Sequence, residues 1–455
     1  MPGTASSRGM RHNDMYAAIH TARSGAGIAR QWRCIPAPTV RLFTSLVAAM
    51  RSCMLLFMGA CVAVLPACGT LPRTPIPQEL ADKAEIPGMP RVRFWGDAAD
   101  PAFVEAFLAN LDRERAALGL QSLSELPRAQ YLGLSGGGSD GAFGAGLLCG
   151  WTQHGDRPTF EVVTGVSTGA LIAPLAFLGP EYDDLMREVY TTVTLSDIAR
   201  IRGVIRGLTT DAFTDNTPLR NLVNRYMDEK VLEAVAAESR KGRLLIIGTT
   251  DMDSQRPVIW SMGAIARSGH PKALELFRQI LLASASIPGV FPPEMIEVEV
   301  EVDGVVRRYD EMHCDGGVTT QVFLYPSSFR FDGLPMSAGA RGGSVYVVRN
   351  GRVNPAFQTI ERRTLVIARR AVSTLIKTQG IGDLVRIYLA CLRDGLDYRL
   401  AYIPNSFVDV SSEPFDPAQM NALFDLGFDM AKGGFPWRTA PIGFAGAPVS
   451  EGIQP

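Results

Sequence analysis

The stretch YLGLSGGGSDGAFGAGLL, residues 131–148, places three consecutive glycines between a short apolar run and a segment of small residues. The apolar run predicts a buried strand, and the small residues predict a helix that packs closely on a sheet. Glycine backbone at such a turn leaves N–H groups accessible, which suits a phosphate, a dinucleotide or the negative oxygen of a reaction intermediate. The rest of the chain must discriminate between these ligands.

The composition is typical of a globular protein with a sizeable core. The chain has 455 residues, of which 46% are hydrophobic and 20% charged, and its formal net charge is −1. Such a balance offers no basic face for nucleic acid. Cys149, Cys314 and Cys391 lack the spacing of metal ligands and are expected to be buried thiols. We therefore expect no metal, no cofactor and no nucleic-acid partner.

The N-terminal region indicates export. An apolar run at 54–66 follows Arg51 and is shorter than the ~20 residues of a membrane span, so it predicts the core of a signal peptide. It ends in LPACG, residues 65–69, which resembles the lipobox of bacterial lipoproteins. That resemblance implies lipidation at Cys68 and a lipoprotein anchored in the bacterial cell envelope, at the outer membrane. The alternative is an ordinary secretory signal or an uncleaved anchor.

The sequence divides into five parts. We expect a leader and signal peptide at 1–67, with translation starting at Met50, and a proline-rich tether at 68–96. A helical extension at 97–127 precedes the core of the fold at 128–335. Residues 336–455 contain no assignable motif and are expected to complete the sheet and its covering helices.

From residue 131 onward the pattern alternates strands, turns and helices. Such alternation predicts an α/β fold with a mostly parallel sheet, helices on both faces, and a site at the carboxyl ends of the strands. The expected strands are 131–134, 160–165, 243–251, 257–262, 344–350 and 398–403, with a hairpin at 299–309. The expected helices are 101–118, 141–151, 170–178, 274–285, 354–377 and 382–393.

One interpretation of the glycine loop is dinucleotide binding. Gly136, Gly138 and Gly141 fit G-x-G-x-x-G, and Glu161 follows at about 20 residues, where a ribose-binding acid is expected. However, Glu161 opens the next strand rather than closing it, and Asp140 would repel a phosphate. The loop also lacks the Lys-Ser/Thr ending of a nucleotide P-loop. Dinucleotide binding is therefore the less favoured interpretation.

The other interpretation is an oxyanion hole beside a nucleophile. Residues 165–169, GVSTG, match G-x-S-x-G at a strand-to-helix junction, the setting of a nucleophile elbow. The glycines allow a sharp turn, and the helix that follows directs N–H groups and its positive dipole at Ser167. The alternative is a turn of small residues that only allows close packing. The combination with the triple glycine favours Ser167 as a nucleophile.

A serine nucleophile needs a base to accept its proton. Asp315 is followed by two glycines, as suits a carboxylate at a strand end, and a carboxylate can act as base when burial raises its proton affinity. His313 lies two residues earlier, on the same face of the expected strand, and is the rival base. We favour a Ser167–Asp315 dyad.

With these motifs in this order, the chain resembles the patatin-like phospholipases. The segment ASASIPGVFPP, residues 283–293, adds to the resemblance, which covers about residues 131–325. It implies a three-layer α/β/α sandwich and a lipid acyl hydrolase of the phospholipase A or lysophospholipase type, without a catalytic histidine. Carried over, Ser167 is the nucleophile, Asp315 the base, and Gly136, Gly137 and Gly138 the oxyanion loop. Membrane lipids or other acyl esters would be the substrates.

The chain departs from the family at one position near the site. The family often has Arg or Lys two residues after the triple glycine, whereas this chain has Asp140. The resemblance therefore implies acyl-ester hydrolysis more directly than a phospholipid preference. The remaining alternatives are a general carboxylesterase or thioesterase, and a non-catalytic lipid-anchored binding protein of the envelope.

Overall fold

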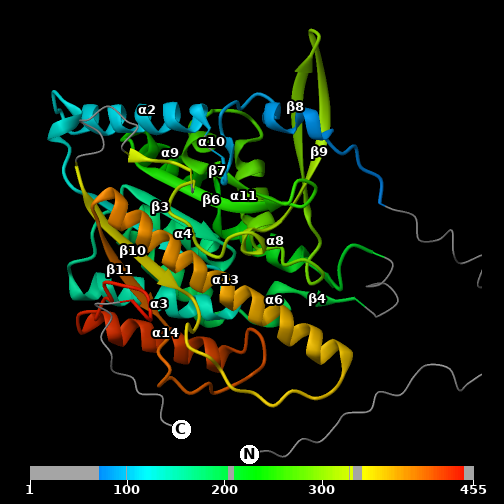
Figure 1. Cartoon of the computed structure of the whole chain (residues 1–455), viewed down its shortest axis with the longest axis vertical. Helices are drawn as coiled ribbons and strands as arrows, with labels where there is room; N and C mark the ends of the chain where they lie inside the picture. Colours follow the sequence, from blue (N-terminus) through cyan, green and yellow to red (C-terminus); the bar gives the residue numbers. More distant parts are fainter. Residues whose placement is uncertain (1–70, 99, 203–209, 327, 332–340, 445–455) are drawn as a thin grey trace, which may run out of the picture. The chain divides into compact units, whose positions relative to one another are not determined.

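The computed structural model of the chain describes residues 71–444, except 99, 203–209, 327 and 332–340. In this described part, nine strands form one sheet flanked by helices (Figure 1). The strand order is β1-β7-β6-β3-β2-β10-β11, and β9 pairs with both β6 and β8. The strands are β1 (Arg93–Trp95), β2 (Ala129–Leu134), β3 (Val162–Val166), β6 (Leu244–Asp251), β7 (Arg256–Ser261), β8 (Glu294–Val302), β9 (Val305–Asp315), β10 (Gly343–Arg349) and β11 (Leu396–Tyr402).

The sheet is mixed, with a parallel centre. Strands β6, β3, β2, β10 and β11 run parallel to one another. Strands β7 and β9 join β6 in the antiparallel sense, and β1 and β8 extend them. The predicted α/β/α architecture, with a mostly parallel sheet covered on both faces, is confirmed.

Alternate residues of each central strand face two separate cores. Leu245 and Ile247 enter one core, and Leu244 and Ile246 enter the other, because successive side chains of a strand point to opposite faces. Helices α2 (Pro101–Ala117) and α13 (Thr364–Asp394) cover one face. The opposite face is covered by α3 (Gly141–His154), α4 (Thr168–Leu178), α5 (Asp183–Thr192), α8 (Thr217–Tyr226), α9 (Glu229–Arg240), α10 (Met262–Arg267), α11 (Ala273–Ser284) and α14 (Pro417–Lys432).

The described chain also contains several short elements. A two-stranded sheet pairs β4 (Arg200–Ile201) with β5 (Thr214–Asp215), next to the short helix α6 (Leu195–Ile198). Single 3-10 turns form at η2 (Gln78–Lys83), η3 (Leu123–Glu125), η4 (Gly138–Asp140), η5 (Pro180–Tyr182) and η6 (Gly316–Val318). Two of these turns contain glycines that the sequence singles out: η4 begins at Gly138, and η6 includes Gly316 and Gly317.

The predicted tether at 68–96 is wrong for its described residues. β1 pairs with β7, Glu85 bridges to Glu299, and Pro75 bridges to Asp310. Ile86 and Val92 are buried in the core. The segment lacks an apolar period because it runs across several elements and pairs with each over only a few residues.

The C-terminal half shows one agreement and one correction. The hairpin turn between β8 and β9 is Asp303-Gly304, as expected, and both residues have positive φ, 53° and 77°, as a tight two-residue turn needs. The helices expected at 354–377 and 382–393 form one continuous helix, α13, which begins at Thr364, so residues 354–363 are not helical. Gly380 and Gly382 reduce helix propensity but do not break it here.

Candidate active site

The candidate site lies at the point where the order of the parallel strands reverses, on either side of β2. From β2 the chain passes to β3 on one side, and β10 occupies the other side of β2. Loops after these parallel strands therefore diverge at their carboxyl ends and leave a crevice, the usual place for a ligand in an open α/β sheet. The glycine loop follows β2, Ser167 follows β3, and Asn350 follows β10. The sheet topology thus brings the three loops to one edge.

Ser167 occupies a sharp, strained turn between β3 and α4. Its φ of 55° and ψ of −125° lie in a region that side chains rarely adopt. A Cβ at Gly165 would lie 2.4 Å from the Gly169 carbonyl oxygen, and a Cβ at Gly169 would lie 2.3 Å from that of Leu134. Both glycines are therefore required by the turn. This is the geometry of a nucleophile elbow.

A second serine, Ser284, is hydrogen-bonded to the backbone of the elbow. The Ser167 N–H donates to the Ser284 Oγ at 3.0 Å, and that hydroxyl donates to the Gly248 carbonyl oxygen at 2.7 Å. Ser284 is fully buried at the end of α11, within the 283–293 motif. The hydroxyl thus links the backbone of Ser167 to β6, which explains one serine of that motif in physical terms.

Strand register brings Asp315 beside Ser167. β3 pairs with β6 only as far as Val166 opposite Gly248, and β7 occupies the other edge of β6. β9 therefore continues the edge that β3 leaves, pairing Asp315 with Thr249. If β3 continued by one residue, Ser167 would pair with Thr249, which instead pairs with Asp315. The turn that carries Ser167 therefore lies beside the end of β9.

The Asp315 carboxyl group is buried and hydrogen-bonded. It accepts a hydrogen bond from the Gly317 N–H at 2.7 Å, and the Ser167 hydroxyl lies close enough to help lower its pKa. Burial raises the pKa of Asp315 to about 6, although both groups act to lower it. A Cβ at Gly317 would lie 2.9 Å from Asp315 Oδ1, and one at Gly316 would lie 2.5 Å from the Gly248 carbonyl oxygen. The packing thus requires both glycines after the aspartate.

The rival base, His313, is engaged elsewhere. Its side chain is fully buried, with Nδ1 3.0 Å from Thr249 Oγ1 and Nε2 3.1 Å from Glu311 Oε2. Glu311 also forms a buried bidentate ion pair with Arg93 of β1. Among the described residues, no hydrogen bond joins His313 to Ser167. The histidine belongs to a polar network that ties β1, β6 and β9 together.

The glycine loop presents two amides with no partner. Within the described chain, the N–H groups of Gly137 and Gly138 have no hydrogen-bond acceptor, and Gly137 is exposed. Gly136 differs from the prediction, because its N–H donates to the Gln321 carbonyl oxygen at 3.0 Å. Its position still matters, since a Cβ there would lie 3.1 Å from Ser167 Cβ. Of the three predicted glycines, Gly137 and Gly138 are therefore the ones whose amides are available to an oxyanion.

A buried cation that the sequence did not reveal lies behind this loop. Arg349, at the end of β10, donates from Nη1 to the Gly136 carbonyl oxygen at 2.9 Å and to Ser135 Oγ at 3.1 Å. Ser135 Oγ also donates to the Gly136 oxygen at 2.7 Å. That carbonyl and the Gly137 N–H belong to one planar peptide unit. Fixing the carbonyl therefore fixes the direction of the Gly137 donor.

The charge of Arg349 survives its burial. Desolvation lowers the pKa of Arg349 to about 10, which leaves the guanidinium protonated at neutral pH, and nearby Asp140 acts in the opposite direction. Burial raises the pKa of Asp140 to about 6. The sequence signal for a cation that orients the glycine loop was Arg349 itself, a charged residue at the end of a mostly apolar strand.

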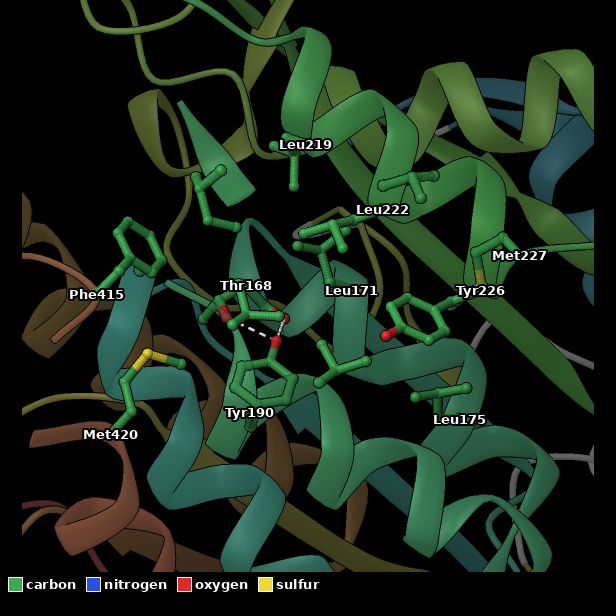
Figure 2. A pocket seen from close by; sticks show the side chains of 15 residues that line it. Thr168, Leu171, Leu175, Tyr190, Leu219, Leu222, Tyr226, Met227, Phe415 and Met420 are labelled. Carbon is green, nitrogen blue, oxygen red and sulfur yellow. Dashed lines mark hydrogen bonds between the residues drawn. The ribbon is translucent and has the colours of Figure 1, made fainter. Parts of the chain in front are cut away.

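An apolar cavity opens beside the nucleophile (Figure 2). Its volume is about 610 Å³, including the part open to solvent, and Gly138 and Thr168 line the end nearest the site. Leu171 and Leu175 follow one and two turns further along α4, so the cavity extends along that helix. The other lining residues labelled in Figure 2 are Tyr190, which is hydrogen-bonded to Thr168, and Leu219, Leu222, Tyr226, Met227, Phe415 and Met420.

Two predictions concern residues away from this cavity. Glu161, the acid of the dinucleotide interpretation, precedes β3, and its carboxylate accepts from the Gln130 N–H at 2.5 Å. It therefore lies at the amino ends of the parallel strands, opposite the glycine loop, which contradicts that interpretation. Cys149, Cys314 and Cys391 are buried free thiols, as expected.

The predicted signal peptide, the start at Met50 and the lipidated Cys68 all lie outside the described residues. Within residues 71–444, apart from the gaps named above, no helix has the length and apolarity needed to cross a bilayer.

Comparison with known proteins finds one family match. A search of the curated proteins gives no match. Among solved structures, the chain matches VipD from Legionella pneumophila with 11% identity and a TM-score of 0.32, over 67% of this chain and 66% of that one. Residues 132–324 match the family model described as patatin-like phospholipase. The matched segment contains the glycine loop, Ser167 and Asp315. Over residues 132–324 the chain is therefore similar to the patatin-like phospholipases.

Proposed function

We propose that the chain is a serine acyl hydrolase that cleaves carboxylic esters of lipids, of the phospholipase A or lysophospholipase type, through a Ser167–Asp315 dyad. The observation that carries this proposal is the placement of a strained serine hydroxyl beside a buried carboxyl group, next to two amides that have no acceptor among the described residues. The match of residues 132–324 to a lipid hydrolase family supports the same class of reaction. A carboxylesterase or thioesterase with shorter substrates is the nearest alternative.

The proposed reaction is acyl transfer to water in two steps. Asp315 accepts the Ser167 proton while Oγ attacks the ester carbonyl carbon, and the carbonyl oxygen becomes an oxyanion held by the Gly137 and Gly138 N–H groups. The intermediate collapses, and the leaving alcohol takes the proton from Asp315. Water then gives a proton to Asp315 and attacks the acyl-enzyme, and collapse releases the acid and restores the Ser167 hydroxyl.

The apolar cavity supports a lipid acyl group as substrate. Its wall is almost entirely hydrocarbon, and it begins at Gly138 and Thr168, next to the reacting oxygen. A polar head group would lose its hydration there without compensating hydrogen bonds, whereas an acyl chain would gain by leaving water. The acyl side of the ester therefore occupies the cavity and the alcohol side faces solvent. Lipidation at Cys68, proposed from the sequence, would hold the enzyme at an envelope membrane.

The test is hydrolysis of a defined substrate panel. Purified protein should release free fatty acid from phosphatidylcholine or lysophosphatidylcholine, and should cleave a palmitoyl nitrophenyl ester faster than the butyryl ester. Mass spectrometry of the products identifies the bond that is broken. Cleavage of short esters or thioesters alone would favour the alternative enzyme class, and no turnover of any substrate would favour a binding protein.

A matched pair of variants tests the cavity in the same assay. Leu222→Trp narrows the cavity from its wall and should lower the palmitoyl-to-butyryl ratio about tenfold, since one bulky side chain excludes several methylenes. Leu232→Trp adds the same bulk to a half-buried leucine of α9 that does not line the cavity. The control should keep the ratio of the unmodified protein.

Activity should depend on the ionisation of Asp315. Because burial raises the pKa of Asp315 to about 6, the base is protonated and inactive below that pH. We expect kcat/KM for a neutral ester to rise about tenfold per pH unit up to about pH 6 and then to level off. A pH–rate profile measures this. A profile that stays flat down to pH 4 would contradict the raised pKa. The control variant His313→Gln should show the same rise of kcat/KM up to about pH 6.

A further inference from the structure

The first half of α13 projects beyond the packed body of the protein (Figure 1). In its second half, Leu384, Ile387 and Cys391 are buried against the sheet. In contrast, residues 366–378 are exposed except for the partly buried Arg370 and Lys377. Both of these side chains reach back to the preceding loop, where Lys377 donates to the Asn354 carbonyl oxygen. The described chain leaves the rest of this half uncovered.

The uncovered half is amphipathic, and its apolar face points away from the protein. Ile367, Ala371 and Leu375 follow one another at intervals of four residues, which places them on one face of the helix. Leu375 is 70% exposed. Buried Leu384 comes nine residues later, which is two and a half helical turns, and therefore lies on the opposite side. Val372, 55% exposed, lies beside Leu375 on the outward face.

The same half is strongly basic. Within residues 364–378, Arg369, Arg370 and Lys377 give a net charge of +3, and Arg362 and Arg363 lie just before the helix. Glu361 pairs with Arg363, and no acidic residue lies between 362 and 382. Apolar residues on one face with arginine and lysine on the other are typical of helices that lie in a membrane interface.

The helix passes close to the candidate active site. At its middle, Gln379 Nε2 donates to the Val318 carbonyl oxygen at 3.4 Å, and a Cβ at Gly380 would lie 3.2 Å from the Arg349 guanidinium carbon. Val318 ends the η6 turn that follows Asp315 and is 46% exposed. A surface bound by the first half of α13 therefore lies near the loops that carry the dyad.

We propose that residues 364–378 of α13 bind the surface of an anionic lipid bilayer, with the helix lying in the interface. Ile367, Val372 and Leu375 enter the acyl boundary, and the exposed Arg369, with Arg362 just before the helix, contacts anionic head groups. A second copy of the chain is a poorer occupant, since two segments that each carry +3 repel one another. This docking surface goes beyond the catalytic proposal, because binding requires neither Ser167 nor turnover.

The experiment measures vesicle binding by the full chain carrying Ser167→Ala, so that lipid composition stays constant. Co-flotation with phosphatidylcholine vesicles is compared with co-flotation with vesicles containing about one third phosphatidylglycerol. Leu375→Asp places a charge at the centre of the apolar face. Ser373→Asp adds the same charge two residues away, on the far side of the helix. Any contribution of residues 1–70 is common to both variants and to the parent protein.

We expect stronger binding to the anionic vesicles, weakened by salt. Leu375→Asp should reduce the apparent affinity about tenfold or more, and Ser373→Asp less than about threefold. The proposal would be overturned if the two variants reduced binding equally, or if the affinity for vesicles were the same with and without phosphatidylglycerol. Lipid-free association that Leu375→Asp abolishes, measured by sedimentation velocity, would overturn it in favour of a second copy. Circular dichroism confirms that both variants fold.

Discussion

Ser167→Ala is expected to lower kcat for ester hydrolysis by about 10⁴- to 10⁶-fold, since the variant retains the oxyanion donors but lacks the nucleophile. Asp315→Asn should lower kcat about 10⁴-fold. The amide keeps the shape of the carboxylate and the acceptor for the Gly317 N–H, but it cannot take the serine proton. The double variant should be no slower than Ser167→Ala alone, because the two groups act as a unit. Steady-state rates on a nitrophenyl ester measure all three.

Stability measurements separate catalysis from folding in this series. A buried carboxyl group whose pKa is raised is destabilised in its ionised form, so the fold is favoured below about pH 6 and loses stability as pH rises through that value. Asp315→Asn removes this charge and should leave the free energy of unfolding at neutral pH unchanged or higher. A serine-directed fluorophosphonate should label the parent protein at Ser167. Near-normal turnover by either single variant would refute the dyad.

Arg349→Met is expected to lower kcat about 10²-fold with little change in KM. The guanidinium holds the Gly136 carbonyl, and through it the Gly137 N–H, in the direction of the developing oxyanion. Without it, the peptide unit keeps only the Ser135 hydroxyl as donor to that carbonyl. The donor then needs to reorient during the reaction, which weakens stabilisation of the transition state but not of the bound ester. Steady-state kinetics resolve the two parameters.

Two further variants make the Arg349 experiment specific. Arg349→Lys keeps a positive charge and one donor, and should restore part of kcat. Arg352→Met removes a neighbouring arginine that pairs with Asp409 at the surface, and should change kcat less than about threefold. A rise in KM with unchanged kcat would assign Arg349 to substrate binding, and equal losses in Arg349→Met and Arg352→Met would indicate a general structural effect.

Local motifs made most of the site predictable from sequence. The glycines around Ser167 and after Asp315 are dictated by contacts of 2.3–2.9 Å that a Cβ would make, so each motif is visible in the sequence by itself. Choosing between Asp315 and His313 required the pairing of β9 with β6, which depends on residues far apart in the chain. The sequence could favour the aspartate but could not exclude the histidine.

The features that sequence reasoning missed are all long-range. Arg349 follows the glycine loop by more than 200 residues and meets it only because β10 pairs with β2. The occupied amide of Gly136 depends on the Gln321 carbonyl oxygen, which no local pattern reveals. Similarly, the N-terminal segment looked like a tether because its partners, β7 and β8, come about 170 to 210 residues later.

The Asp315 carboxylate is positioned by a short antiparallel pairing between β9 and β6. Only three residues of β9 take part, opposite Thr249, Thr250 and Asp251. The rest of β9 pairs with β8 in a hairpin that stands away from the main sheet (Figure 1). Local opening of the pairing with β6, which the buried network of Arg93, Glu311 and His313 opposes, would separate Asp315 from Ser167 without melting the central strands. Activity can therefore be lost while the rest of the fold persists.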